Sequence, residues 1–134
     1  WNLTDGDTLR RDNNAAELRK AAEGSLAFAQ TELAVRHLNG VGTARDASQA
    51  LVWARRAVEQ NDPRAMDVLA FLYEHGFGTS RNLDEAARLY ERAIAAGYDS
   101  KANLERVRRQ RAGRAGTGGS GGGAPADPKP LYKE

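Results

Sequence analysis

A repeat with a period of 36 residues is the feature that most constrains the fold of this chain. The strongest match aligns LAVRHLNGVG, from Leu33 to Gly42, with LAFLYEHGFG, from Leu69 to Gly78. Repeated units of this length stack on one another, because a single unit cannot bury its own apolar surface. The residues that recur unchanged include Ala29, Leu33, Ala34, Gly40, Gly42, Thr43, Ala50, Arg56 and Ala57, each found again 36 positions later.

Each unit is predicted to consist of two helices, since its apolar residues recur with a helical period. Asp62 and Pro63 form a typical helix start, and Gly76 can adopt the left-handed conformation that ends a helix. Asp46 and Asn82 are predicted caps of the second helices. The predicted helices span residues 25–39, 47–60, 63–75 and 83–96, with flanking helices over 13–23 and 100–112.

The repeated pattern resembles that of Sel1-like repeats, relatives of the tetratricopeptide repeat, over roughly residues 14 to 105. It comprises Ala, Leu-Ala, an aromatic residue, Gly-x-Gly, then Ala, Trp and a closing Gly97. His37 stands where an aromatic is usual, and Asn61 where Gly is usual. The resemblance implies an all-α fold, an α-solenoid of antiparallel helix pairs with two full repeats and flanking partial-repeat and capping helices. It also implies a scaffold or adaptor without catalysis or cofactor.

The composition divides the chain into four parts. Residues 1–12 form an N-terminal segment, and residues 13–112 form the repeat domain. Seven of the 14 glycines fall between Gly113 and Gly123, which predicts a flexible linker over 113–123. Residues 124–134 form a Pro-containing extended peptide with two apolar side chains, Leu131 and Tyr132. This tail is interpreted as a docking peptide, a disordered natural tail or a peptide fused through an engineered linker. Because residue 1 is Trp, we expect a processed or excised fragment.

The first helices of the units are expected to line a concave groove, by the helical phase of the related tetratricopeptide repeats. An exposed apolar strip edged by polar groups is typical of a binding surface. The alternative is that Phe28 and Leu38 pack under the N-terminal segment. We expect a peptide segment of a partner protein, or Leu131 and Tyr132 of the same or a neighbouring molecule, to bind there. The predicted peptide-binding residues are Phe28, Thr31, Val35, Leu38, Asn39, Arg64, Asp67, Phe71, Glu74, His75, Asn103 and Val107.

An arginine-rich stretch at residues 106–114 suggests a second function, the electrostatic binding of anionic membrane or nucleic acid. It contains Arg106, Arg108, Arg109, Arg111 and Arg114. The other interpretation is a solvated helix end, in which Arg106 lies on the outward face of a terminal cap. The chain carries 20 Lys and Arg against 18 Asp and Glu, a formal net charge of +2, so nucleic acid is not the expected partner.

Catalytic and metal-binding motifs are weak in this sequence. The chain has no cysteine, so thiolate metal sites and disulfides are excluded. His37 occupies the aromatic core position and His75 precedes a loop, so no metal is expected. An enzyme built on Asp67, Glu74 and His75 is the least favoured class. The chain contains no run of about 18 apolar residues, so no transmembrane helix is predicted. The resemblance favours the bacterial periplasm or cell envelope, with the cytoplasm as the alternative.

Overall fold

The computed structural model describes residues 16–117, without the side chains of 114–117, together with residues 131 and 132. The described residues contain helices and no strand. A first helix covers residues 16–23. The others are α2 (Ala27–Asn39), α3 (Ala47–Glu59), α4 (Pro63–His75), α5 (Leu83–Ala95) and α6 (Lys101–Thr117). The predicted all-α fold is confirmed.

The predicted helix caps are present. The Asp46 side chain accepts a hydrogen bond from the Gln49 N–H at 3.1 Å, and the Asn82 side chain accepts one from the Glu85 N–H at 3.0 Å. Asp62 caps α4, with Pro63 at its first position. These side chains satisfy N–H groups that have no partner in the first turn of a helix. Asp46 and Asn82 therefore start the second helix at the same place in each repeat.

A left-handed residue separates each second helix from the next unit. Ser25, Asn61 and Gly97 adopt φ of 72°, 63° and 98°, and they are spaced by 36 residues. Glycine adopts this conformation without steric cost, and asparagine tolerates it. Asn61 therefore closes the turn where the family pattern usually has glycine. Ser25 lies in this turn instead of in α2, so the helix begins at Ala27 and not at residue 25.

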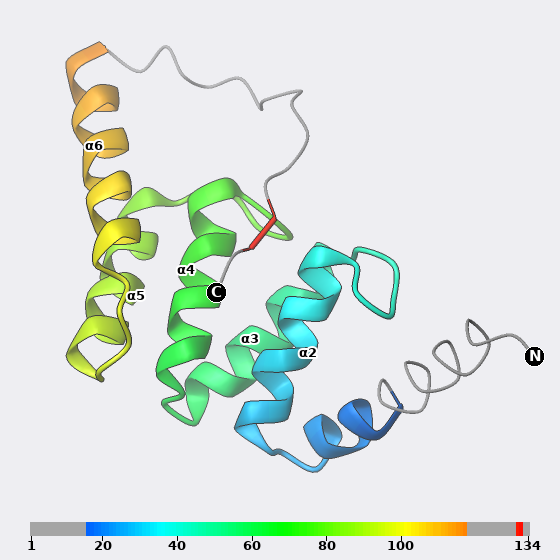
Figure 1. Ribbon diagram of the computed structural model, residues 1–134. Coiled ribbons are helices and arrows are strands. Elements are labelled where there is room, and N and C mark those ends of the chain that lie inside the picture. The colour runs from blue at the N-terminus through cyan, green and yellow to red at the C-terminus, as the bar shows by residue number, and fades with distance from the viewer. Residues whose placement is uncertain (1–15, 118–130, 133–134) are drawn as a thin grey trace, which may run out of the picture.

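The helices form a stack of antiparallel pairs. Helix α2 packs on α3 and α4 packs on α5, while α3 contacts α4, α5 contacts α6, and α2 also touches α4. Figure 1 shows α2, α4 and α6 towards the viewer, with α3 and α5 behind them. Alanines without exposed surface line the helix contacts and allow the axes to approach. They are Ala34, Ala50, Ala54, Ala57, Ala65, Ala70, Ala86 and Ala93.

Large side chains fill the space between these alanines in one continuous core. Leu33 and Leu69 are buried at equivalent positions of the two units, and Trp53 and Leu89 form a second equivalent pair. Tyr90 lies in the same core and has no exposed surface. His37 is also buried, as expected for its aromatic position. The stacked repeats thus share a core that neither could form alone.

The predicted end of the last helix is wrong. Helix α6 continues to Thr117, five residues beyond the expected end at residue 112, so 113–117 are not linker. Glycine lowers helix propensity by about 1 kcal/mol but does not end a helix by itself. An ion pair between Arg111 Nε and Asp84 Oδ1, 3.0 Å apart, holds this part of α6 against the start of α5. The predictions for residues 1–12, 118–123 and 124–130 lie outside the described residues.

Across the described part of the chain, no helix combines the length and apolar character needed to cross a lipid bilayer.

Candidate functional site

The candidate site is the surface formed by α2, α4 and α6, which we call the A-helix face. Residues 131 and 132 lie on it, between the C-terminal end of α2 and α4 (Figure 1). Tyr132 is buried, with 4% of its surface exposed, whereas its neighbour Leu131 is 54% exposed. The A-helix face therefore already holds a side chain from the C-terminal tail.

Asn39 binds the backbone of Tyr132 through both atoms of its side-chain amide. Its Oδ1 accepts a hydrogen bond from the Tyr132 N–H at 2.8 Å, and its Nδ2 donates one to the Tyr132 carbonyl at 2.9 Å. Asn39 is the last residue of α2, directly before the left-handed Gly40. Its position at the helix end places its amide beside the tail.

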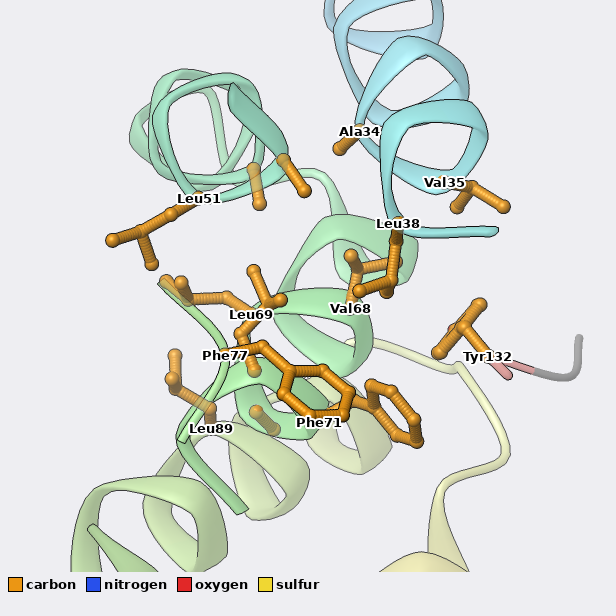
Figure 2. Close-up of a cluster of buried hydrophobic side chains, with 14 of the residues drawn as sticks. Ala34, Val35, Leu38, Leu51, Val68, Leu69, Phe71, Phe77, Leu89 and Tyr132 are labelled. Carbon is orange, nitrogen blue, oxygen red and sulfur yellow. The ribbon is translucent and has the colours of Figure 1, made fainter. Parts of the chain in front are cut away.

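The Tyr132 side chain enters the apolar part of the face. Its ring packs edge-on against Phe71 of α4, with 5.2 Å between the ring centroids. Figure 2 shows Tyr132 at the margin of the cluster that contains Val35, Leu38 and Phe71. The His75 ring also packs on Phe71, at a centroid distance of 4.4 Å. Phe71, a predicted peptide-binding residue, therefore contacts Tyr132 directly, and Val35 and Leu38 belong to the same buried cluster.

The hydroxyl of Tyr132 donates a hydrogen bond to Oδ2 of Asp67, which is itself buried. The other carboxylate oxygen of Asp67 accepts from the Ser100 hydroxyl at 2.5 Å and from Asn103 Nδ2 at 3.0 Å. Burial and the adjacent Asp67 charge raise the pKa of the Tyr132 hydroxyl well above its ordinary value. The phenol therefore stays protonated and remains a donor.

Glu74, one of the predicted peptide-binding residues, is already hydrogen-bonded to other side chains of the protein. Its carboxylate accepts bonds from Arg106 Nε at 2.6 Å, Arg106 Nη2 at 2.7 Å, the Tyr90 hydroxyl at 2.8 Å and Gln110 Nε2 at 2.8 Å. Burial alone would raise the pKa of Glu74, but the bonds from Arg106 and Tyr90 outweigh it and hold the pKa below its ordinary value. Glu74 therefore joins α4 to α5 and α6.

The remaining predicted residues lie apart from Tyr132 or beneath the surface. Thr31 is buried and donates to Asp62 Oδ2 at 2.5 Å, and Val107 has no exposed surface. Phe28 is 66% exposed near the start of α2, with the Arg64 guanidinium 5.9 Å from its ring centroid. Arg64 also pairs with Glu32 at 2.9 Å. Phe28, Thr31 and Arg64 lie towards the N-terminal ends of α2 and α4, away from Asn39, whereas Val107 lies on α6.

Sequence reasoning placed Arg106 on the outward face of α6, and this prediction is wrong. Its guanidinium points to the buried Glu74. Ser100 and Tyr90 were not identified as polar partners either. A usable signal was present, because Glu74 stands where the preceding unit has Leu38, and Tyr90 stands where it has Ala54. A buried acid in place of an apolar residue requires donors on the neighbouring helices.

The acidic and histidine side chains of the face show no metal-ligand arrangement. His75 Nε2 lies 3.8 Å from Glu74 Oε2, and burial lowers the pKa of His75 from its ordinary value. Among the described residues, no group of three or more His, Asp or Glu side chains could hold a metal ion. The arrangement is suited to hydrogen bonding and packing.

Comparison with known proteins identifies the repeat. The Sel1 repeat model matches residues 27–62 and 63–98. The chain is 32% identical over 109 residues to the chitin synthase regulator SKT5 of Saccharomyces cerevisiae, which covers 78% of this chain and 15% of that protein. It is 34% identical over 83 residues to human protein sel-1 homolog 2, covering 61% of this chain and 12% of that protein. The chain thus spans a small part of each relative.

Solved structures agree on the fold. A Sel1 repeat protein from Oxalobacter formigenes superposes with a TM-score of 0.63 at 33% identity, over 69% of this chain and 39% of that one. A protective antigen of uropathogenic Escherichia coli strains with an SLR fold superposes with a TM-score of 0.67 at 25% identity, over 81% of this chain and 27% of that one. Sel1 repeat proteins are typically non-catalytic and generally mediate protein–protein interactions. With two matched repeats stacked as helix pairs, this chain belongs to the Sel1 repeat family.

Proposed function

We propose that this protein is a non-catalytic scaffold or adaptor whose A-helix face binds an extended peptide segment of a partner protein. The observation that carries the proposal is the pair of hydrogen bonds between the Asn39 amide and the backbone of Tyr132. Two bonds to one residue's N–H and C=O hold an extended chain whatever its side chains are. In this proposal, Tyr132 occupies the place that a residue of a partner peptide would take.

The C-terminal tail is the proposed ligand within the chain. Tyr132 supplies the buried group and Leu131 an exposed neighbour. Because the tail is covalently attached, its local concentration at the face is high, and a weak contact suffices to keep it bound. A partner peptide would have to displace it. The tail would therefore compete with a partner peptide and raise the concentration of partner needed for binding.

The ligand is proposed to bind to two regions of the face. Val35, Leu38 and Phe71 provide apolar contact around the ring, with Asn39 and Asp67 as polar partners. The exposed Phe28 with Arg64 extends the surface for a longer ligand. Residues that hold the helices together from beneath, which include Thr31, Glu74, Asn103 and Val107, position this surface.

Electrostatic binding through the arginines of residues 106–114 is less well supported. Arg106 is bonded to Glu74, Arg111 pairs with Asp84 at 3.0 Å, and Arg108 lies 4.0 Å from Glu91. Nearby carboxylates offset much of the positive charge. Binding of anionic lipid or nucleic acid would weaken steeply with salt, whereas recognition on the A-helix face would change little.

The function can be tested with the full-length chain carrying Tyr132→Ala, which removes the ring and hydroxyl of the tail from the face. A synthetic peptide of residues 124–134 should bind with modest, micromolar-range affinity and shift the NMR signals of Asn39, Asp67 and Phe71. In a receptor that also carries Asn39→Ala, which removes both backbone hydrogen bonds, binding should weaken about tenfold. Circular dichroism would confirm that both receptors are folded. Absence of saturable shifts in a folded receptor would refute the proposal.

For the compartment, we propose the bacterial periplasm or cell envelope, with the cytoplasm as the alternative. The two solved structures described above come from bacteria. Fractionation of the source cells, with the native gene product followed by antibody, would decide between the two.

A further inference from the structure

The A-helix face contains a hydrogen-bond acceptor that only some ligand side chains can satisfy. Asp67 is buried, and its Oδ1 already accepts from Ser100 at 2.5 Å and from Asn103 at 3.0 Å. Its Oδ2 accepts the bond from the Tyr132 hydroxyl. A buried carboxylate oxygen left without a donor is costly, because it has lost its hydration and gained nothing in return.

From this geometry we infer that the face binds preferentially a tyrosine with a free hydroxyl, in a partner peptide as in the tail. The inference rests on the proposed function and specifies its ligand. Three contacts define the residue that fits. Asn39 holds the backbone, Phe71 packs against the aromatic ring in a T-shaped arrangement at 5.2 Å, and Asp67 accepts from the hydroxyl. Phenylalanine satisfies the first two contacts and leaves Oδ2 of Asp67 without the donor that tyrosine supplies.

The neighbouring residue of the ligand contributes little to this preference. Leu131 is 54% exposed, while Tyr132 is 4% exposed. The selectivity therefore belongs to one position of the ligand. A partner segment needs a tyrosine in extended backbone, and the residue before it can vary.

Phosphorylation of that tyrosine is incompatible with the site. The phosphate takes the place of the hydroxyl hydrogen that forms the bond to Asp67, and it brings about two negative charges close to a buried carboxylate. Glu74, a second acid on the same helix, already receives both described bonds of the Arg106 guanidinium. Repulsion and desolvation then act in the same direction. A phosphotyrosine in the tail or in the partner would leave the face.

The test uses the full-length Tyr132→Ala chain as receptor and four peptides of residues 124–134. One is unmodified, and the others carry Tyr132→Phe, Leu131→Ala or phosphotyrosine at position 132. We expect the unmodified and Leu131→Ala peptides to bind with similar affinity. The Tyr132→Phe peptide should bind at least about tenfold more weakly, as expected for a lost bond to a charged acceptor. The phosphopeptide should show no saturable binding.

A second receptor assigns the preference to Asp67. Adding Asp67→Asn keeps the size of the side chain but removes the charge, so the ratio between the tyrosine and phenylalanine peptides should shrink. Thermal unfolding of each receptor checks that this change leaves the fold intact. Equal affinities of the two peptides for the Tyr132→Ala receptor would overturn the inference and leave peptide binding standing. Failure of every peptide to bind that folded receptor would overturn the proposed function as well.

Discussion

At the scale of single residues, the A-helix face depends on buried acids whose charges are met by hydrogen bonds. Asp67 receives neutral donors from Ser100, Asn103 and Tyr132. Glu74 receives the Arg106 guanidinium. A neutral-donor site can exchange one donor for another from a ligand, while a site closed by a charged side chain holds the helices together. The two acids thus have different roles although they lie two turns apart on α4.

Replacing Glu74 by Gln should lower the free energy of unfolding by about 1–3 kcal/mol near pH 7, because the bonds to Arg106 lose their charge. The folded-state pKa of Glu74 lies below its unfolded value. Its stabilising contribution is therefore fully present above the unfolded pKa and is lost as the pH falls through the folded pKa. Urea unfolding at neutral and acidic pH should show the difference between wild type and Glu74→Gln closing at low pH.

Glu85→Gln is the control for this measurement. Glu85 pairs with Arg88 at 3.0 Å on the surface, where such pairs contribute about 0.2–1 kcal/mol. Its effect on unfolding should be correspondingly small. A Glu74→Gln difference that is as large in acid as at neutral pH would contradict the assigned role of the carboxylate.

Replacing His37 by Phe should stabilise the protein, and more so at acidic pH. Among the described residues, neither nitrogen of the buried His37 ring finds a hydrogen-bond partner. Burial lowers its pKa, with Asp46 opposing and Arg19 adding to the shift. The unfolded chain takes up a proton near pH 6.5 and the folded chain does so only at a lower pH, so wild-type stability falls as the pH drops below about 6.5.

For His37→Phe we expect a gain of about 1 kcal/mol at neutral pH, which widens towards pH 5. Thermal and urea unfolding across this range measure it, and the unchanged His75 cancels in the comparison. A constant difference between the two proteins would show that His37 does not titrate as its burial requires.

At the scale of the elements, the Gly-x-Gly loop of the second unit packs closely on the first. A Cβ at Gly78 would lie 2.6 Å from the Ala47 carbonyl oxygen at the start of α3. A Cβ at Gly42, the equivalent position of the first unit, meets only Arg36 Nη1 at 4.0 Å. Both glycines have left-handed φ, of 71° and 75°. A side chain at either position would therefore strain the backbone equally, but only the one at position 78 would also clash with a neighbour.

Gly78→Ala should destabilise the protein by about 2–4 kcal/mol, since strain and a clash with backbone add. Gly42→Ala should cost only the strain, about 1–2 kcal/mol. Equilibrium denaturation of both variants provides the comparison. Equal losses would mean that the loop does not pack on α3 as described.

At the scale of the whole molecule, the bond between the tail and the face is intramolecular. Asn39 and Tyr132 are 93 residues apart in one chain. Occupancy of the face should therefore not depend on protein concentration. NMR shifts of Asn39 and Phe71 should stay constant on dilution, and sedimentation should give a monomer. Loss of the Tyr132 contacts on dilution, together with a falling mass, would indicate exchange of tails between neighbouring molecules.

The repeat, its helices and most of its core could be predicted from the sequence because their causes are local and recur. Asp46, Asn82 and Asp62 cap helices through N–H groups two or three residues away. The small residues at helix contacts are visible as alanines repeated at the same spacing. Asn39, Asp67 and Phe71 also follow from helical phase. That phase places side chains on a face but does not assign their partners.

Only the tertiary structure decided those partners. Arg106 bonds Glu74 from 32 residues away, Ser100 bonds Asp67 from 33, and Tyr132 reaches Asn39 across 93. Each choice depends on how α6 and the tail lie against α4. That geometry is set by the packing of the whole stack. The sequence by itself determined a Sel1-type array of helix pairs, and the three-dimensional arrangement determined which buried carboxylate is closed by arginine and which accepts a tyrosine hydroxyl.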